Sequence, residues 1–172
     1  MTKALPVVAL LFVSTVALAQ GGPTDPQIAH IVVTANQIDI DAGKLAQTKA
    51  SNPGVKAFAQ QMITDHTGVN KQAKDLAQKL KVKPEDNPTS RSLTQGSRDN
   101  LANLRGLTKG AAFDRAYVSH EVEYHQAVLD AMDKALIPNA KNAELKALLV
   151  KVRPAFVAHL EHARHVQESL GK

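Results

Sequence analysis

The segment His-Glu-Val-Glu-Tyr-His at residues 120–125 places two histidines and two glutamates within six residues. Imidazole and carboxylate groups together suit zinc, iron, manganese and copper, so this segment could contribute to a transition metal site. A helix turns by about 100° per residue, and on that spacing Glu121 and His125 lie side by side. We therefore expect Glu121 and His125 to point inward, and His120 and Glu123 to point outward. The apolar residues that share the inward face are Val118, Val122, Leu129 and Met132.

Three further segments carry ionisable residues on or beside an apolar helical face. His66 and His159 each align with apolar residues of their own segments, whereas Asp65 lies at the flank of such a face and Asp39 borders another. A buried charge is unfavourable unless it is paired or binds a metal, and helical bundles build metal sites from side chains of facing helices. The sequence therefore predicts a transition metal site (zinc, iron, manganese or copper) formed by residues from His66, His125, His159, Glu121, Asp39 and Asp65.

The same side chains could instead form a metal-free core network. In that alternative, Asp39 or Glu121 holds a histidine proton, and the histidines brace the helices against one another. No Ser-His-Asp arrangement, glycine-rich phosphate loop or dinucleotide fingerprint occurs, so no catalytic residue is predicted. A small enzyme with an open coordination position on a bound metal is a third hypothesis, and it requires an accessible pocket.

The elements that position these residues are expected to be helices. Apolar residues recur at three- and four-residue spacing, and no period-two strand pattern is found. Pro26 and Pro53 each follow a capping residue, which marks two helix starts, and Pro154 should kink the last helix. Four long helices with a short extra helix between the second and third predict an all-α, antiparallel four-helix bundle. The long helices are expected at about residues 26–45, 53–81, 108–136 and 142–170, and the short one at about 93–104.

The first 19 residues have the composition of a secretory signal peptide. Lys3 gives a positively charged start, residues 4–18 are almost wholly apolar, and residues 17–19 form an A-x-A cleavage signal. We expect cleavage before Gln20, which leaves residues 20–172 as one helical domain in the periplasm or outside the cell. No later segment reaches ~18 consecutive apolar residues, so no transmembrane segment is expected in the mature chain.

Composition excludes other classes of partner. The chain has no cysteine, so the oxidising compartment is not used for disulfides. Its net charge of +5 is spread without a dense basic run, and aromatic residues make up only 3% of the sequence. Without a basic stripe or a stacking platform, a nucleic acid partner is not expected.

Four stretches that span nearly the whole expected mature chain resemble a large family of exported bacterial proteins of unknown function, often labelled outer-membrane proteins. The resemblance implies a ferritin-like four-helix bundle and no established activity. Asp39 stands where the family has a glutamate, and its side chain is shorter. The stretches are NQIDIDAGKLA (36–46), VKAFAQQMITDHTGVN (55–70), GAAFDRAYVSHEVEYHQAVLD (110–130) and RPAFVAHLEHARHVQ (153–167).

This sequence departs from ferritin-like proteins that bind two irons. Those proteins use a Glu-x-x-His pair on each of two helices, and no such pair occurs here, because Glu121 and His125 are four residues apart. We therefore expect a histidine-richer site for a single ion, or a degenerate site, with a role in metal handling or envelope stress protection. The alternative function is a metal-free structural or interaction module of the bacterial envelope.

Overall fold

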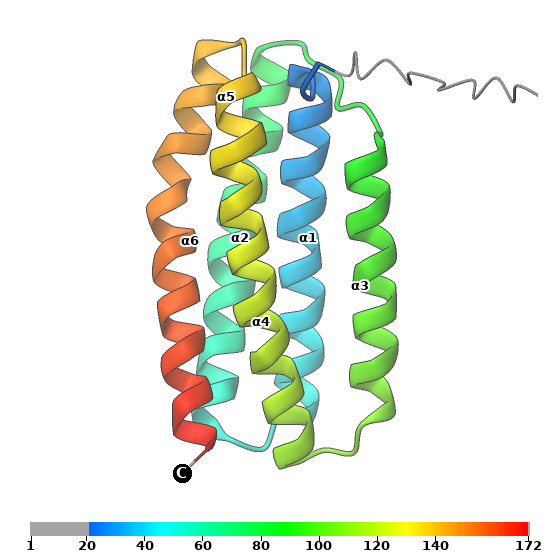
Figure 1. The fold of residues 1–172 in the computed structure, drawn as a ribbon, viewed down its shortest axis with the longest axis vertical. Helices are drawn as coiled ribbons and strands as arrows, with labels where there is room; N and C mark the ends of the chain where they lie inside the picture. The colour runs from blue at the N-terminus through cyan, green and yellow to red at the C-terminus, as the bar shows by residue number, and fades with distance from the viewer. Residues whose placement is uncertain (1–20, 172) are drawn as a thin grey trace, which may run out of the picture.

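The computed structural model describes residues 21–171, and every regular element in them is helical (Figure 1). The all-α fold class is therefore confirmed. The predicted signal peptide at residues 1–19 lies outside the described residues. The elements are α1 (Asp25–Lys49), α2 (Pro53–Lys79), α3 (Pro88–Gly106), α4 (Ala111–Ala131), the π-helical turn η1 (Met132–Leu136), α5 (Ile137–Asn139) and α6 (Ala143–Leu170).

Four long helices surround the core. α1 packs on α2 and α4, and α6 packs on the other sides of α2 and α4, so that the four form a closed ring. Each helix runs antiparallel to both of its neighbours in this ring (Figure 1). This arrangement confirms the predicted antiparallel four-helix bundle.

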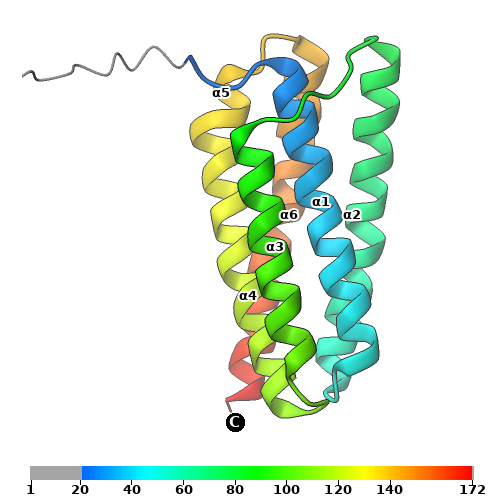
Figure 2. The ribbon, with the colours of Figure 1, turned by 90° about the vertical axis from the view of Figure 1, so that its right-hand side faces the viewer.

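The extra helix α3 lies outside the ring. It packs along α1 and α4, as the view in Figure 2 shows, and it returns the chain from one end of the bundle to the other. The extra helix lies where it was predicted, between the second and third long helices, and at 19 residues it is longer than the predicted range of about 93–104. Leu93, Ser97 and Leu101 of α3 are only partly buried, whereas Leu104 is buried, because α3 covers the bundle from one side alone.

Side-chain caps and one buried carboxylate fix the helix ends. The Asn52 side chain accepts hydrogen bonds from two backbone N–H groups at the start of α2, and Asn142 does the same for α6. Asp114 on α4 accepts from the backbone N–H groups of Ser51 and Asn52, both at 2.9 Å. This contact ties the α1–α2 corner to α4, so Asp114 has a structural role.

The helix at residues 108–136 differs from its prediction in both bounds and geometry. α4 ends at Ala131, and the π-helical turn η1 follows, in which the Ile137 N–H bonds to the carbonyl of Met132, five residues back. Pro138 has no N–H group for an ordinary i to i−4 hydrogen bond, and the wider π-helical turn lies directly before it.

The last helix, α6, is helical on both sides of Pro154.

The bundle core is continuous from end to end but changes character in its middle. Apolar clusters fill both ends, and the buried polar residues of α1, α2, α4 and α6 lie between them. Gly43 allows α1 and α2 to approach closely, since a Cβ there would lie 3.0 Å from the Ala59 carbonyl oxygen. No helix within residues 21–171 has the length and apolar character needed to cross a membrane.

Candidate metal centre

Three histidines from three helices meet in the middle of the core. His66 on α2, His125 on α4 and His159 on α6 are at most 2% exposed. Their ring centroids lie 5.1 Å apart for His66 and His159, and 5.5 Å apart for each of the other two pairs. One ring nitrogen from each lies within 4.8 Å of those from the other two. The bundle therefore brings together the three histidines that the sequence predicted.

The His66 ring is held by Asn36 of α1. The Asn36 amide nitrogen donates to the Val32 carbonyl at 2.7 Å, and this contact fixes which side of the amide faces His66. The amide oxygen then accepts from His66 Nδ1 at 2.7 Å. His66 Nδ1 therefore carries the proton, and Nε2 is left with a lone pair.

The other two imidazoles are anchored in the same manner. His125 Nδ1 donates to the backbone carbonyl of Glu121 at 2.9 Å, and His159 Nε2 donates to Asp65 Oδ2 at 2.9 Å. The second ring nitrogen of all three histidines is buried and has no hydrogen-bond partner among the described residues. A metal-binding imidazole has the same arrangement, with one nitrogen free to ligate and the other donating to an oxygen that orients the ring.

Two buried carboxyl groups lie beside the imidazoles. Asp39 on α1 and Glu121 on α4 are 1% and 0% exposed, and no donor among the described residues reaches their carboxyl oxygens. The two carboxyl groups lie close enough to hydrogen-bond each other when one of them is protonated. Asp39 Oδ2 lies 3.6 Å from His66 Nε2, and Glu121 Oε2 lies 3.5 Å from His125 Nδ1. Asp39, Glu121 and His125 also form a second group whose ligand atoms lie within 4.8 Å of one another. We call these five residues, His66, His125, His159, Asp39 and Glu121, the histidine–carboxylate cluster.

Burial dominates the electrostatics of this cluster. It raises the pKa of Glu121 to about 8, and burial together with the charge of Glu121 raises the pKa of Asp39 well above its usual range. Burial and the neighbouring imidazoles lower the pKa of His66 to about 2. Burial also lowers the pKa of His125 to about 4. It lowers the pKa of His159 too, although the hydrogen bond to Asp65 opposes this shift. The imidazoles are therefore neutral at pH 7, which is the form that binds metal.

Asp65 and the remaining histidines lie at the periphery. Asp65 has a 40% exposed side chain and holds His159, in agreement with its predicted place at the flank of α2. Glu123 and His165 are exposed. His120 was predicted to point outward, but it is half-buried, and its ring stacks on Tyr124 with centroids 5.6 Å apart. Its helical angle alone gave the wrong answer, because Tyr124 covers it.

Two residues near the cluster were missed in the sequence. Asn36 lies within the apolar stripe of α1, three residues before Asp39, and this position was the available signal. Tyr117 lies one turn before Glu121 on the inward face of α4, fully buried, and its hydroxyl has no partner among the described residues. Burial, together with the charges of Glu121 and Asp39, raises its pKa well above the usual range.

Comparisons with known proteins concern most of the chain. Residues 13–166 match the family described as "Domain of unknown function (DUF4142)". Among solved structures, the chain is similar to "CopM in the Cu(II)-bound form", with a TM-score of 0.67 and 18% sequence identity. That similarity covers 87% of this chain and 99% of that chain, and at this identity it concerns the fold. No curated protein matches the sequence.

Proposed function

The chain belongs to the DUF4142 family of domains of unknown function, and we propose that its bundle binds a transition metal ion at the histidine–carboxylate cluster. His66 Nε2, His125 Nε2 and His159 Nδ1 would be the nitrogen ligands. Asp39 or Glu121 would add an oxygen ligand, and Asp65 and Asn36 would orient two of the rings. The proposed function is binding and handling of the ion.

The observation that carries this proposal is the unpartnered ring nitrogen on each of three buried histidines. A buried polar atom without a partner costs about 1–3 kcal/mol, and three such atoms on neighbouring rings add their costs in one place. A single cation between them would satisfy all three at once. A metal-free network is less well supported, because it would leave the three ring nitrogens unpartnered even if Asp39 and Glu121 share a proton.

Copper is the first candidate for the ion. The similar solved structure, CopM, is described as Cu(II)-bound, and three imidazoles with carboxylate oxygens nearby suit Cu(II). Zinc, iron and manganese also accept this set of ligands, so the choice of metal is an outcome of the experiment below. If residues 1–19 act as the predicted signal peptide, the ion would be handled in the periplasm or outside the cell, in metal homeostasis or envelope stress protection.

Elemental analysis of the untagged protein, purified from the periplasm without chelator, tests the proposal. We expect about one transition metal ion per chain, loss of this metal in His125→Ala, and retention in His165→Ala. His165 is the control because it is an exposed histidine outside the cluster.

A second measurement covers the case in which the ion is lost during purification. Added copper, zinc or iron should raise the melting temperature of the chelator-treated protein, since a ligand that binds only the folded state stabilises it. The proposal would be contradicted if the purified wild-type protein contains no metal and none of the three ions changes its melting temperature. The cluster would then be a structural network, and the function would lie on the outer face.

A further inference from the structure

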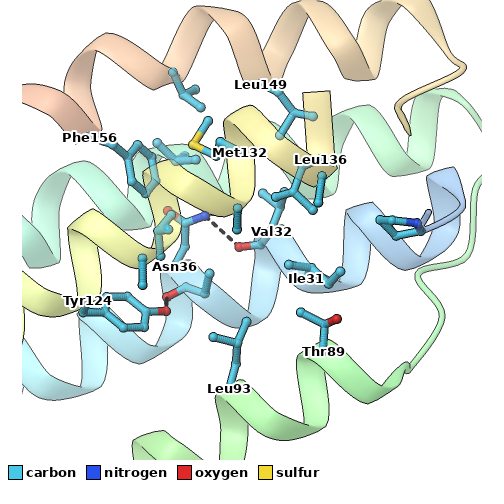
Figure 3. A pocket seen from close by; sticks show the side chains of 18 residues that line it. Ile31, Val32, Asn36, Thr89, Leu93, Tyr124, Met132, Leu136, Leu149 and Phe156 are labelled. Carbon is cyan, nitrogen blue, oxygen red and sulfur yellow. Dashed lines mark hydrogen bonds between the residues drawn. The ribbon is translucent and has the colours of Figure 1, made fainter. Parts of the chain in front are cut away.

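A pocket that opens to solvent on one side lies next to the histidine–carboxylate cluster, between α1, α2, α3, α4, η1 and α6 (Figure 3). Its volume is about 180 Å³, and we call it the apolar cavity. Eighteen residues line it, and all but Asn36, Thr89 and Tyr124 are apolar. Phe156 and Asn36 form part of its inner wall and also contact His66, so this wall separates the cavity from the cluster.

The side-chain polar groups of Asn36 and Tyr124 in the cavity wall already make hydrogen bonds within the protein. Asn36 donates to the Val32 carbonyl, as the dashed line in Figure 3 shows, and accepts from His66. The Tyr124 hydroxyl donates to the Ala35 carbonyl at 3.1 Å. Only the Thr89 hydroxyl, on an exposed residue at the rim, remains. A buried water needs about two to four polar partners, so the interior of this cavity suits an apolar guest rather than water.

Small side chains on α4 and the π-helical turn η1 leave the space unfilled. Ala127, Ala131 and Ala135 recur every fourth residue and face it with side chains too small to fill it, and Ala35 faces it from α1. The π-helical turn then places Met132, Ala135 and Leu136 together in the wall. π-Helical turns are rare and frequently accompany functional sites.

We propose that the apolar cavity binds one small apolar molecule about the size of a single aromatic ring. The size follows from the volume, because an apolar cavity of about 150 Å³ in another protein stays dry and admits benzene. Thr89 and Ala127 are exposed at the rim, which gives the molecule a route between α3 and α4. The proposal concerns a different set of wall atoms from the metal ligands, so it does not depend on metal binding.

Calorimetric titration of benzene into the chelator-treated, full-length wild-type protein tests the proposal. We expect saturable binding of about one molecule per chain and a rise in melting temperature of about 2–4 °C near saturation. Ala131→Leu should weaken binding at least about tenfold, because the added side chain fills the space. Ala102→Leu is the matched control, since Ala102 is exposed on α3 and does not line the cavity, and its binding should equal that of the wild type.

Two further variants keep the outcome decisive. If Ala131→Leu does not fold, Ala135→Leu fills the same space from η1 and replaces it. His125→Ala should bind benzene as the wild type does, even where it has lost metal, so the two proposals fail separately. Absence of saturable binding in the wild type, or equal affinity in the folded cavity-filling variant, would overturn the inference.

Discussion

The histidine–carboxylate cluster and the apolar cavity share a wall, yet their compositions are opposite. The cluster contains three buried ring nitrogens without a hydrogen-bond partner among the described residues, and two buried carboxyl groups that have only each other as a partner. The cavity has almost no free polar group and a volume of about 180 Å³ that side chains do not fill. Phe156 lies between them, because its ring packs edge-on against His66 with centroids 5.1 Å apart and also lines the cavity.

The two regions destabilise the folded chain through different terms. Each unpartnered polar group in the cluster costs about 1–3 kcal/mol in desolvation. A void costs about 24 cal/mol per Å³ in lost contacts, which is up to about 4 kcal/mol for a cavity of this size. A cation relieves the first cost and an apolar molecule the second. The comparison therefore indicates two sites of opposite chemistry that Phe156 keeps apart.

Removal of the shared wall should have the largest effect. We expect Phe156→Ala to lower the free energy of unfolding by about 3–5 kcal/mol, because a buried aromatic side chain is lost where a void already exists. The truncation also joins the cavity to the cluster, so water and chelator reach the imidazoles more easily. Urea unfolding measures the first effect, and the rate at which a chelator removes copper from the loaded protein measures the second.

Leu160→Ala is the control for this variant. Leu160 is buried on the same helix one turn later and does not line the cavity. Its truncation should also destabilise the protein, by about 2–5 kcal/mol, without opening the wall. If both variants lose copper at the same rate under conditions of equal stability, then Phe156 does not separate the two regions.

The helices and most of the cluster could be predicted from the sequence. Periodicity placed His66, His125, His159 and Glu121 inward, and all four are at most 2% exposed. Asp39 lay at the border of its stripe and could not be placed, although it is 1% exposed. The burial of Asp39 depends on tertiary packing, because α2, α4 and the outer helix α3 all cover α1. The buried face of α1 is therefore wider than that of a helix that contacts the core on one side only.

The apolar cavity could not be predicted. It depends on the π-helical turn, and the sequence around Pro138 indicates only that the ordinary helix is disturbed there. It also depends on the side-chain volumes of six elements that meet at one place, and periodicity within a single helix contains no information about that sum. Asn36 was missed for a similar reason, because its partner His66 lies on another helix.

The polar character of the cluster should appear as a pH dependence of stability in the metal-free protein. Glu121 has its pKa raised from 4.5 to about 8 in the folded state, so the folded state holds a proton that the unfolded state releases. Stability should therefore fall as the pH rises, by about 2 kcal/mol between pH 6 and pH 8 from this group. His66 and His125 act oppositely, since their lowered pKa values remove stability as the pH falls below about 6.5.

Glu121→Gln should reduce the alkaline part of this dependence, because the amide does not ionise and only the Asp39 carboxyl, whose pKa is also raised, remains to lose a proton. Urea unfolding of chelator-treated protein at several pH values between 6 and 9 measures the slope of stability against pH. Glu123→Gln is the control, since Glu123 is exposed on the same helix and its substitution should leave the slope unchanged. An equal slope in wild type and Glu121→Gln would mean that the Glu121 carboxyl is not held protonated in the core.

The smallest expected effect concerns the periphery of the cluster, where it meets solvent. Asp65→Asn keeps an oxygen that accepts from His159 Nε2 but removes the negative charge that makes the imidazole a stronger ligand. We expect about a tenfold loss of copper affinity, equivalent to about 1.4 kcal/mol, whereas His159→Ala should abolish binding. Competition with a chelator of known affinity measures both, and Asp75→Asn, on an exposed residue of the same helix, is the control. A loss as complete as that in His159→Ala would make Asp65 a direct ligand, and the metal site would then extend beyond the buried cluster to the surface of α2.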